Sequence, residues 1–260
     1  MENDFLDFNR KRWNALVQAG VSWGRPRLDL DETSARAFVD PHGFIGDVRG
    51  KDVLCLASGG GQQTAAFAVL GANVTVLDLS DEMLAGDRLA AAHYHLPIRI
   101  EQGDMRDLSR FADASFDVVY HVYSINFVPR VEPVYDGVQR VLRPGGLYFT
   151  QVSNPFSFGI DEHDWTGQGY LLRDPYIEGA EAENTVWDVE DTAGVLRQVA
   201  GPREWRHTLS TVLNALAARG FGLLGLWEEQ SANPQAESGS WDHFMHIAPP
   251  WFSLWYRCQR

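Results

Sequence analysis

The residues best suited to ligand chemistry follow short apolar segments that read as strands. Three glycines, Gly59–Gly61, follow the run Val53–Leu56, and glycines there let the backbone approach a ligand closely. Asp78 ends the next apolar run, a spacing that suits a carboxylate gripping both hydroxyls of a ribose. Asp104 and His121–Tyr123 follow the next two runs. Ligands bind at the carboxyl ends of strands in open α/β sheets, so we predict one shared site.

Proton transfer has a second set of candidates farther along the chain. His207 stands just before a predicted helix, where it is either a general base or a helix-start residue bonded to the backbone. His163 lies between acidic residues and is more typical of a solvent-exposed site. The carboxylates considered as bases with them are Asp161, Glu162 and Asp164, and the arginines that would instead bind a substrate carboxylate are Arg173, Arg203 and Arg206.

Alternating strands and helices must position these residues. We predict strands at 52–57, 74–78, 98–101, 116–121, 147–150, 221–228 and 252–257. Helical patterns occupy 62–70 and 80–94 and begin again at 133 and 209. This alternation predicts an α/β fold, a mostly parallel seven-stranded sheet with helices on both faces. A reversed pair closes it, so the last strand is antiparallel.

Two segments lie outside the alternation. Residues 1–50 hold a predicted helix at 5–18 and a shorter one starting at Asp31 or Thr33, an arm that either packs at the sheet edge or closes over the ligand. Residues 153–206 are rich in aromatics and carry 4 − 11 = −7 of the net charge. Because a bare loop of that length is uncommon, we predict a cap there, inserted after the fifth strand. The core is then 51–152, and 207–260 completes the sheet.

Composition disfavours several kinds of partner. The net charge is 22 − 35 = −13 with no basic run, which argues against nucleic acid and anionic membranes. No apolar run is long enough to span a bilayer. Cys55 and Cys258 lie in predicted strands, so we expect no disulfide scaffold and a cytoplasmic protein. We predict no metal site, and a monomer or a homodimer.

Five motifs resemble, in family order, those of the class I S-adenosylmethionine-dependent methyltransferases. The resemblance covers roughly 51–229 and is sharpest to small-molecule enzymes of the ubiquinone/menaquinone type (methyltransferase type 11). It implies a Rossmann-like fold, S-adenosylmethionine as cofactor with S-adenosylhomocysteine as product, and a small-molecule methyl acceptor. The segments that carry it are Val53–Gly61, Val76–Leu84, Gln102–Leu108, Phe116–Val119 and Val141–Gly146.

The resemblance also implies a role for individual residues. Asp78 would hold the ribose hydroxyls, and Asp104 would accept a hydrogen bond from the adenine amino group. His121 and Tyr123 would lie near the sulfonium, with Tyr123 and His207 as the candidate catalytic residues. The remaining cofactor contacts would be Ala57, Ser58, Gly59 and Gly61 at the methionine part, and Leu79, Met83 and Met105 at adenine.

The sequence departs from the family at two positions. Cys55 stands where an acidic residue is usual, and Ala57 where a glycine is usual. The missing acid leaves the cofactor's amino group without its customary indirect partner. A nicotinamide-dependent oxidoreductase is a weaker alternative, because its fingerprint needs glycine where Thr64 stands. A non-catalytic cofactor-binding module is another, although a complete cap favours an enzyme.

Overall fold

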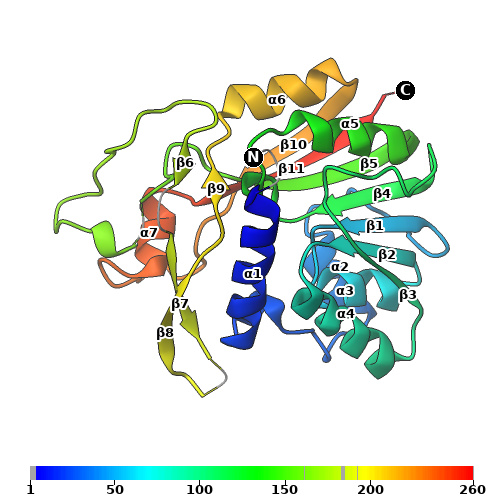
Figure 1. Cartoon of the computed structure of the whole chain (residues 1–260), viewed down its shortest axis with the longest axis horizontal. Helices are drawn as coiled ribbons and strands as arrows, with labels where there is room; N and C mark the ends of the chain where they lie inside the picture. The colour runs from blue at the N-terminus through cyan, green and yellow to red at the C-terminus, as the bar shows by residue number, and fades with distance from the viewer. Residues whose placement is uncertain (1–3, 161, 183–184, 192, 260) are drawn as a thin grey trace.

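The protein is described by a computed structural model that covers residues 4–160, 162–182, 185–191 and 193–259. A seven-stranded sheet forms its centre, in the order β10-β11-β5-β4-β1-β2-β3 (Figure 1). Neighbours from β3 to β5 run parallel, and β11 is antiparallel to β5 and to β10. The predicted fold class is therefore confirmed. In chain order the strands are β1 Asp52–Leu56, β2 Asn73–Asp78, β3 Ile98–Gln102, β4 Phe116–His121, β5 Leu142–Ser153, β10 Phe221–Glu228 and β11 Trp251–Cys258.

Both faces of the sheet must be covered, because the inner strand β1 has apolar side chains on both of them. In β1, Val53 and Cys55 belong to one core cluster, and Leu54 and Leu56 to the other. All four are fully buried, so successive side chains alternate between two cores. Helices α2 Glu32–Val39, α3 Gln63–Val69 and α4 Asp81–Tyr94 cover one face, and α5 Glu132–Val141 and α6 Leu209–Ala218 cover the other (Figure 1).

Local capping sets where the helices begin. The Ser80 hydroxyl accepts a hydrogen bond from the Met83 N–H (3.1 Å) and starts α4, as the sequence predicts. Asp31 accepts from the Ser34 N–H (2.7 Å) and starts α2 with a capping box. The choice left open between Asp31 and Thr33 is thus settled for Asp31.

Helix α1, Asp4–Gln18, lies between the sheet and the segment 153–206 (Figure 1). That segment contains two small antiparallel sheets. One pairs β6 Glu181–Ala182 with β9 Glu204–Trp205, and the other pairs β7 Val186–Glu190 with β8 Leu196–Ala200. The structure adds a helix that the sequence did not predict, α7 Trp241–Ile247, which Ser240 caps. Among the described residues, no helix is both long enough and apolar enough to cross a membrane.

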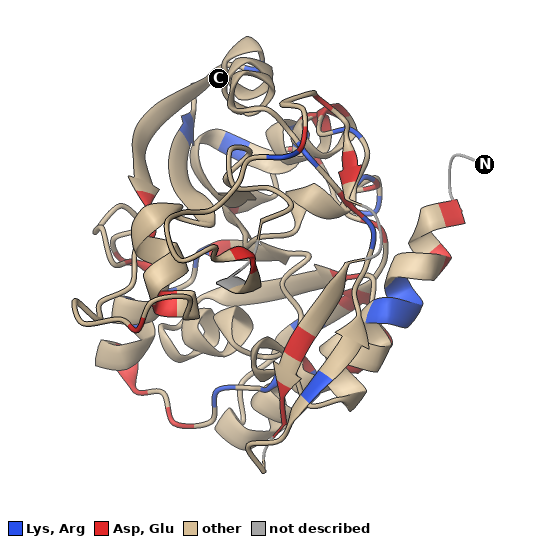
Figure 2. Cartoon of the chain, turned by 90° about the vertical axis from the view of Figure 1, so that its left-hand side faces the viewer, with Lys and Arg blue, Asp and Glu red and all other residues tan. Residues whose placement is uncertain are grey.

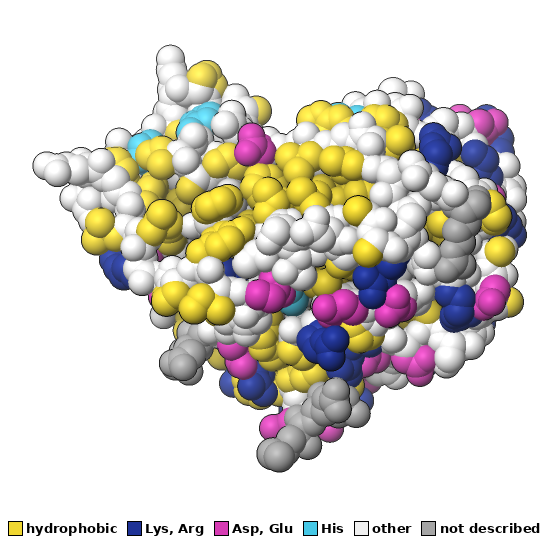
Figure 3. Space-filling model, turned by 90° about the horizontal axis from the view of Figure 1, so that it is seen from above, with side chains coloured by type: hydrophobic (Ala, Val, Ile, Leu, Met, Phe, Trp, Pro, Cys, Tyr) yellow, Lys and Arg dark blue, Asp and Glu magenta, His cyan; other side chains and the backbone are white. Residues whose placement is uncertain are grey.

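The surface of the segment 153–206 differs between its two sides. Figure 2 views the molecule from this side and shows both acidic and basic positions along the ribbon of the β7–β8 hairpin. Figure 3, from above, shows hydrophobic side chains gathered across the upper face. Exposed large hydrophobic residues in this part of the chain are Phe156, Leu171, Leu172, Tyr176, Ile177, Val186, Val195 and Leu196. Phe156 and Tyr176 stack with their ring centroids 4.9 Å apart.

Candidate active site

A large cavity opens at the carboxyl ends of β1, β2 and β4. Its volume is about 1450 Å³, larger than the ~300–1,000 Å³ of an ordinary small-molecule pocket, so it has room for two ligands. Helix α1, the turn η1 (Ser22–Gly24) and the segment 153–206 contribute its other walls. The sequence-predicted residues that line it are Ala57, Ser58, Gly59, Asp78, Leu79, Met83, Asp104, Met105 and Tyr123.

The glycine loop is shaped by close approach of the backbone to its neighbours. A Cβ atom on Gly59 would lie 2.7 Å from the Cβ of Met83 and 3.0 Å from the Asp78 carboxyl. Gly61 has φ +75° and would place a Cβ 2.5 Å from the Gly86 carbonyl oxygen. Gly61 does not line the cavity, and its carbonyl accepts from the Arg27 N–H (3.2 Å). The structure therefore gives Gly61 a part in shaping the loop and Gly59 a place on the cavity wall.

A carboxylate that the sequence analysis missed holds this loop. Asp87 accepts hydrogen bonds from the N–H groups of Gly60 (3.2 Å) and Gly61 (3.1 Å) and from the Thr64 hydroxyl (2.6 Å). Burial raises the pKa of Asp87 to about 7. The sequence carries a signal for this residue, because Asp87 is a charged residue on the otherwise apolar face of α4 between Met83 and Ala90.

Asp78 is built into the same loop. One carboxylate oxygen accepts from the Gly59 N–H (2.9 Å), and the other from the Ser80 N–H (2.8 Å). Burial raises the pKa of Asp78, and these backbone hydrogen bonds oppose that rise. Asp78 thus presents a buried, oriented carboxylate to the cavity, as ribose binding requires.

Asp104 also lines the cavity but already has a cationic partner. Its carboxylate accepts from the Arg106 Nε (2.8 Å) and the Arg106 N–H (2.9 Å). The Arg106 guanidinium lies 4.8 Å from the ring centroid of Phe5 on α1. The third-strand motif is therefore connected directly to the N-terminal helix.

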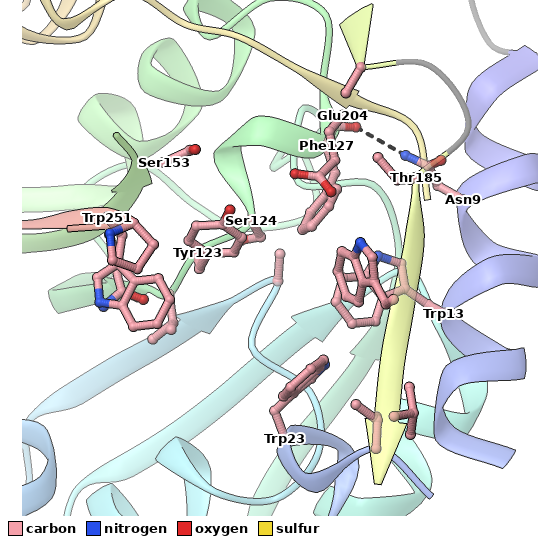
Figure 4. Close-up of a pocket in the computed structure, with 18 of the residues that line it drawn as sticks. Asn9, Trp13, Trp23, Tyr123, Ser124, Phe127, Ser153, Thr185, Glu204 and Trp251 are labelled. Atoms are coloured by element: carbon pink, nitrogen blue, oxygen red, sulfur yellow. Dashed lines mark hydrogen bonds between the residues drawn. The ribbon is translucent and has the colours of Figure 1, made fainter. Parts of the chain in front are cut away.

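The loop after β4 brings Tyr123 to the cavity but leaves His121 outside it. Tyr123 has φ 27°, a strained conformation for a non-glycine residue, and its ring lies 5.9 Å from that of Trp251 (Figure 4). Burial raises its pKa. His121 is fully buried, lines no part of the cavity, and contacts the Tyr148 hydroxyl through Nδ1 (2.8 Å). Burial lowers the pKa of His121 to about 3. Its side chain is thus a core group, unlike the expected sulfonium neighbour.

His207 is likewise absent from the cavity wall. Its Nδ1 lies 2.9 Å from a Glu178 carboxylate oxygen, and its Nε2 lies 2.9 Å from the Val128 carbonyl oxygen. Burial would raise the pKa of Glu178, but hydrogen bonds from His207 and Thr208 hold that pKa at about 2. With both ring nitrogens engaged and the side chain buried, His207 joins the start of α6 to the loop after η2 (Ile125–Phe127).

Replacing His207 with alanine is expected to lower the free energy of unfolding by about 2 kcal/mol, because the Val128 carbonyl and the Glu178 carboxylate lose a buried partner. Turnover per folded molecule should not change. Chemical denaturation and methyl-transfer assays on the same samples measure both quantities. His246→Ala is the control, since His246 is exposed. A 10²–10⁴-fold loss of turnover with stability intact would instead restore the role of general base.

The other proton-transfer candidates are scattered. His163 lines the cavity, and its Nε2 lies 2.9 Å from the Asp188 carboxylate. Asp164 pairs with Arg173 (2.8 Å). Asp161 and the side chain of Glu162 lie outside the described part of the chain.

Aromatic rings form another part of the cavity wall. Trp13 on α1 lies edge-on to Phe127 (5.1 Å between centroids) and to Trp187 (5.5 Å), and Trp23 is edge-on to Trp187 (5.8 Å). Asn9 fixes α1 here, because its amide donates to the carbonyl oxygens of Phe127 (3.3 Å) and Arg203 (3.1 Å) (Figure 4). It also accepts from the Arg203 N–H (2.8 Å). The aromatic residues of the arm therefore form a wall of the cavity.

Glu204 is a second cavity residue that the sequence analysis missed. It lies on β9, is only 8% exposed, and lines the cavity. Figure 4 shows it beside Phe127, between Tyr123 and Trp13. Burial raises its pKa to about 7, opposed by a hydrogen bond from Trp187. Glu204 stands in the segment that was searched for a base, three residues before His207.

The two family departures have different structural consequences. Cys55 is fully buried in the core beneath the cavity, where burial raises the pKa of its thiol. Ala57 lines the cavity at φ 46°, a left-handed conformation that glycine adopts without cost. The chain thus accepts backbone strain at Ala57 to keep the shape of the loop.

Comparisons with known proteins identify the family. Residues 54–150 match the family model described as a methyltransferase domain. A Bacillus subtilis protein named uncharacterized methyltransferase YbaJ is 32% identical, over 88% of this chain and 92% of its own. A ubiquinone biosynthesis O-methyltransferase of Xanthomonas oryzae is 28% identical, over 68% and 74%. The solved S-adenosylmethionine-dependent methyltransferase from Mesorhizobium loti shares the fold, with a TM-score of 0.63 and 23% identity over 89% and 100%. The chain belongs to the S-adenosylmethionine-dependent methyltransferases.

Proposed function

We propose that this methyltransferase transfers the methyl group to a small-molecule acceptor by in-line displacement. One observation carries the proposal. A single cavity is lined both by the glycine loop with Asp78 and by the aromatic wall with Glu204. Its volume of about 1450 Å³ accommodates a cofactor and a small acceptor together. Two reactants held side by side in near-attack geometry avoid a large entropy cost.

The residues on the glycine-loop side fit the cofactor. Gly59 lines the cavity without a side chain, so its backbone can approach a ligand there. The buried Asp78 carboxylate suits the ribose hydroxyls, and Leu79, Met83 and Met105 offer apolar contacts to adenine. When bound, S-adenosylmethionine supplies an electrophilic methyl group, whose bond to sulfur breaks, leaving its electron pair on sulfur, as the acceptor atom bonds to the carbon.

The residues around the aromatic wall would hold the acceptor and exclude water. In this proposal, residues 1–50 act as a lid and 153–206 as a cap over the core 51–152. The bonds from Asn9 to Phe127 and Arg203 support a lid that is closed here. Tyr123, Trp13 and Trp187 then form a largely apolar chamber around the transferred methyl group.

Calorimetric titration tests the cofactor part. We expect S-adenosylmethionine and S-adenosylhomocysteine to bind with micromolar Kd, ~8 kcal/mol of binding free energy, and NAD to bind more weakly. Heat from NAD with none from S-adenosylmethionine would contradict the assigned site. Incubation of the protein and methyl-labelled cofactor with a cell extract, followed by product detection, then tests for a small acceptor. Label found only in macromolecules would contradict that part.

A further inference from the structure

The part of the cavity wall that the segment 153–206 contributes carries more acidic than basic side chains, although Asp188 pairs with His163 (2.9 Å) and Asp191 pairs with Arg197 (3.1 Å). Among the described residues that line the cavity, the basic side chains are Arg25 and His163, whereas the segment 153–206 contributes several carboxylates. Arg25 donates to the carbonyl oxygens of Gly20 and Glu190. The carboxylates of this part of the wall are Asp174, Asp188, Glu190, Asp191 and Glu204. Such a chamber attracts cations and repels carboxylates.

The arginines that could have bound a substrate carboxylate are engaged elsewhere. Arg173 pairs with Asp164 (2.8 Å), and Arg203 pairs with Glu181 (2.5 Å). Arg206 donates to the carbonyl oxygens of Pro175 and Phe158. None of the three lines the cavity. The structure therefore gives an anionic acceptor no arginine of the cap to bind.

Glu204 differs from the other acids because it is buried among aromatic rings. Trp187 donates a hydrogen bond to it, and Phe127 lies beside it (Figure 4). Phe127, Trp13 and Trp187 contact one another with centroids 5.1 to 6.3 Å apart. Aromatic faces attract cations, and one carboxylate among them is the arrangement that suits an ammonium group. An uncompensated buried carboxylate is otherwise costly, so a cationic ligand would relieve that cost.

We propose, on the basis of the proposed function, that the acceptor is an amine and that Glu204 binds its ammonium group and then removes a proton from it. An ammonium nitrogen has no lone pair and cannot attack a methyl group. A Glu204 carboxylate oxygen takes one N–H proton, leaving a neutral amine and a neutral carboxylic acid. The nitrogen lone pair forms the new bond to the methyl carbon as the carbon–sulfur pair leaves with sulfur. The products are an N-methylammonium and S-adenosylhomocysteine, so atoms and charge balance.

The pKa of about 7 that burial gives Glu204 suits this proton transfer. A base works best when its pKa is near the working pH, since it is then ionised in a useful fraction and still basic. An exposed carboxylate, with a pKa near 4, would be a weaker base for an amine.

Matched ligands test the proposal by binding. Phenethylamine, 2-phenylethanol and 3-phenylpropionate share a ring and differ in the end group. Tryptophan fluorescence would report binding to the protein saturated with S-adenosylhomocysteine, because Trp13, Trp23 and Trp187 line the cavity. We expect phenethylamine to bind at least tenfold tighter than the alcohol, with the carboxylate weakest. Glu204→Gln should lower the affinity for the amine at least tenfold and leave that for the alcohol within twofold.

Glu181→Gln is the matched control, because Glu181 lies on β6, paired with β9, but outside the cavity. It should keep the preference for the amine. Equal binding of alcohol and amine by the unmodified protein would overturn the proposal, even if Glu204→Gln does not fold. A preference unchanged in Glu204→Gln, with only S-adenosylmethionine affinity lowered, would overturn it too, because the carboxylate would then serve the sulfonium. Failure of S-adenosylhomocysteine to bind would instead contradict the cofactor site. The affinities of the three ligands would then be measured with the protein in the absence of S-adenosylhomocysteine.

Discussion

Replacing Asp78 with alanine is expected to lower the affinity for S-adenosylmethionine about a hundredfold or more. The carboxylate would accept two charge-assisted hydrogen bonds from the ribose, each ~1.5–3 kcal/mol. It also orients the loop through the Gly59 and Ser80 N–H groups. Its loss therefore removes a ligand contact and loosens the cradle around it. Calorimetric titration gives the change in Kd, and circular dichroism checks that the fold survives.

Asp113→Ala is the control for that experiment, because Asp113 is exposed and pairs only with Arg140 in the described contacts (2.6 Å). It should leave the Kd unchanged. If Asp78→Ala binds the cofactor as tightly as the unmodified protein, Asp78 is only a turn residue and the ribose assignment is wrong.

Asp87 does not line the cavity. Asp87→Asn is nevertheless expected to weaken cofactor binding by one to two orders of magnitude. The Asp87 carboxylate accepts from Gly60, Gly61 and Thr64. An asparagine offers one acceptor oxygen, and its NH₂ group would face an N–H or O–H donor. Each hydrogen bond that is not made costs about 1–3 kcal/mol. Their loss destabilises the conformation of the glycine loop. Titration measures the affinity, and denaturation measures the stability.

Two comparisons separate this explanation from a general loss of stability. Thr64→Val removes one of the three donors and should weaken binding by less than Asp87→Asn. The pKa of Asp87 is about 7 in the folded chain against a usual value of 3.8, so between these values the folded chain binds more protons. Stability from this group therefore falls as pH rises from about 4 to 7. The destabilisation by Asp87→Asn should thus be larger at pH 5 than at pH 8, and the reverse order would contradict the burial of Asp87.

The central sheet could be predicted because its signals are local. The β4 bounds Phe116–His121 agree with the prediction, and β1 to β3 differ by a residue at an end. Strands β1, β2 and β4 contain short apolar runs, and β3 alternates Ile98 and Ile100 with polar residues. The β5 strand begins earlier than predicted, at Leu142, because Leu142 already pairs with Phe116 across the sheet. Pairing with a residue on a distant strand cannot be read from the strand's own sequence.

The positions of the residues that follow the strands could be predicted for the same reason. Residues at strand ends, such as Asp78 and Tyr123, line the cavity as the alternation of strands and helices predicts. Glu204 and His207 are three residues apart, yet only Glu204 reaches the cavity. Pairing of β9 with β6 decides between them, through the register Ala182 to Glu204. A register between two-residue strands cannot be read from composition or periodicity.

Helix α1 is held in place by groups that lie far from it along the chain. Asn9 bonds to groups 118 and 194 positions later in the chain. At ~5–20 residues per second, the second partner is made roughly 10 to 40 s after Asn9 itself. Until then the face that carries Phe5 and Leu16, both buried in the finished fold, has no complete surface to pack against. During synthesis this face of α1 therefore stays incompletely packed until the segment that contains Arg203 has been made.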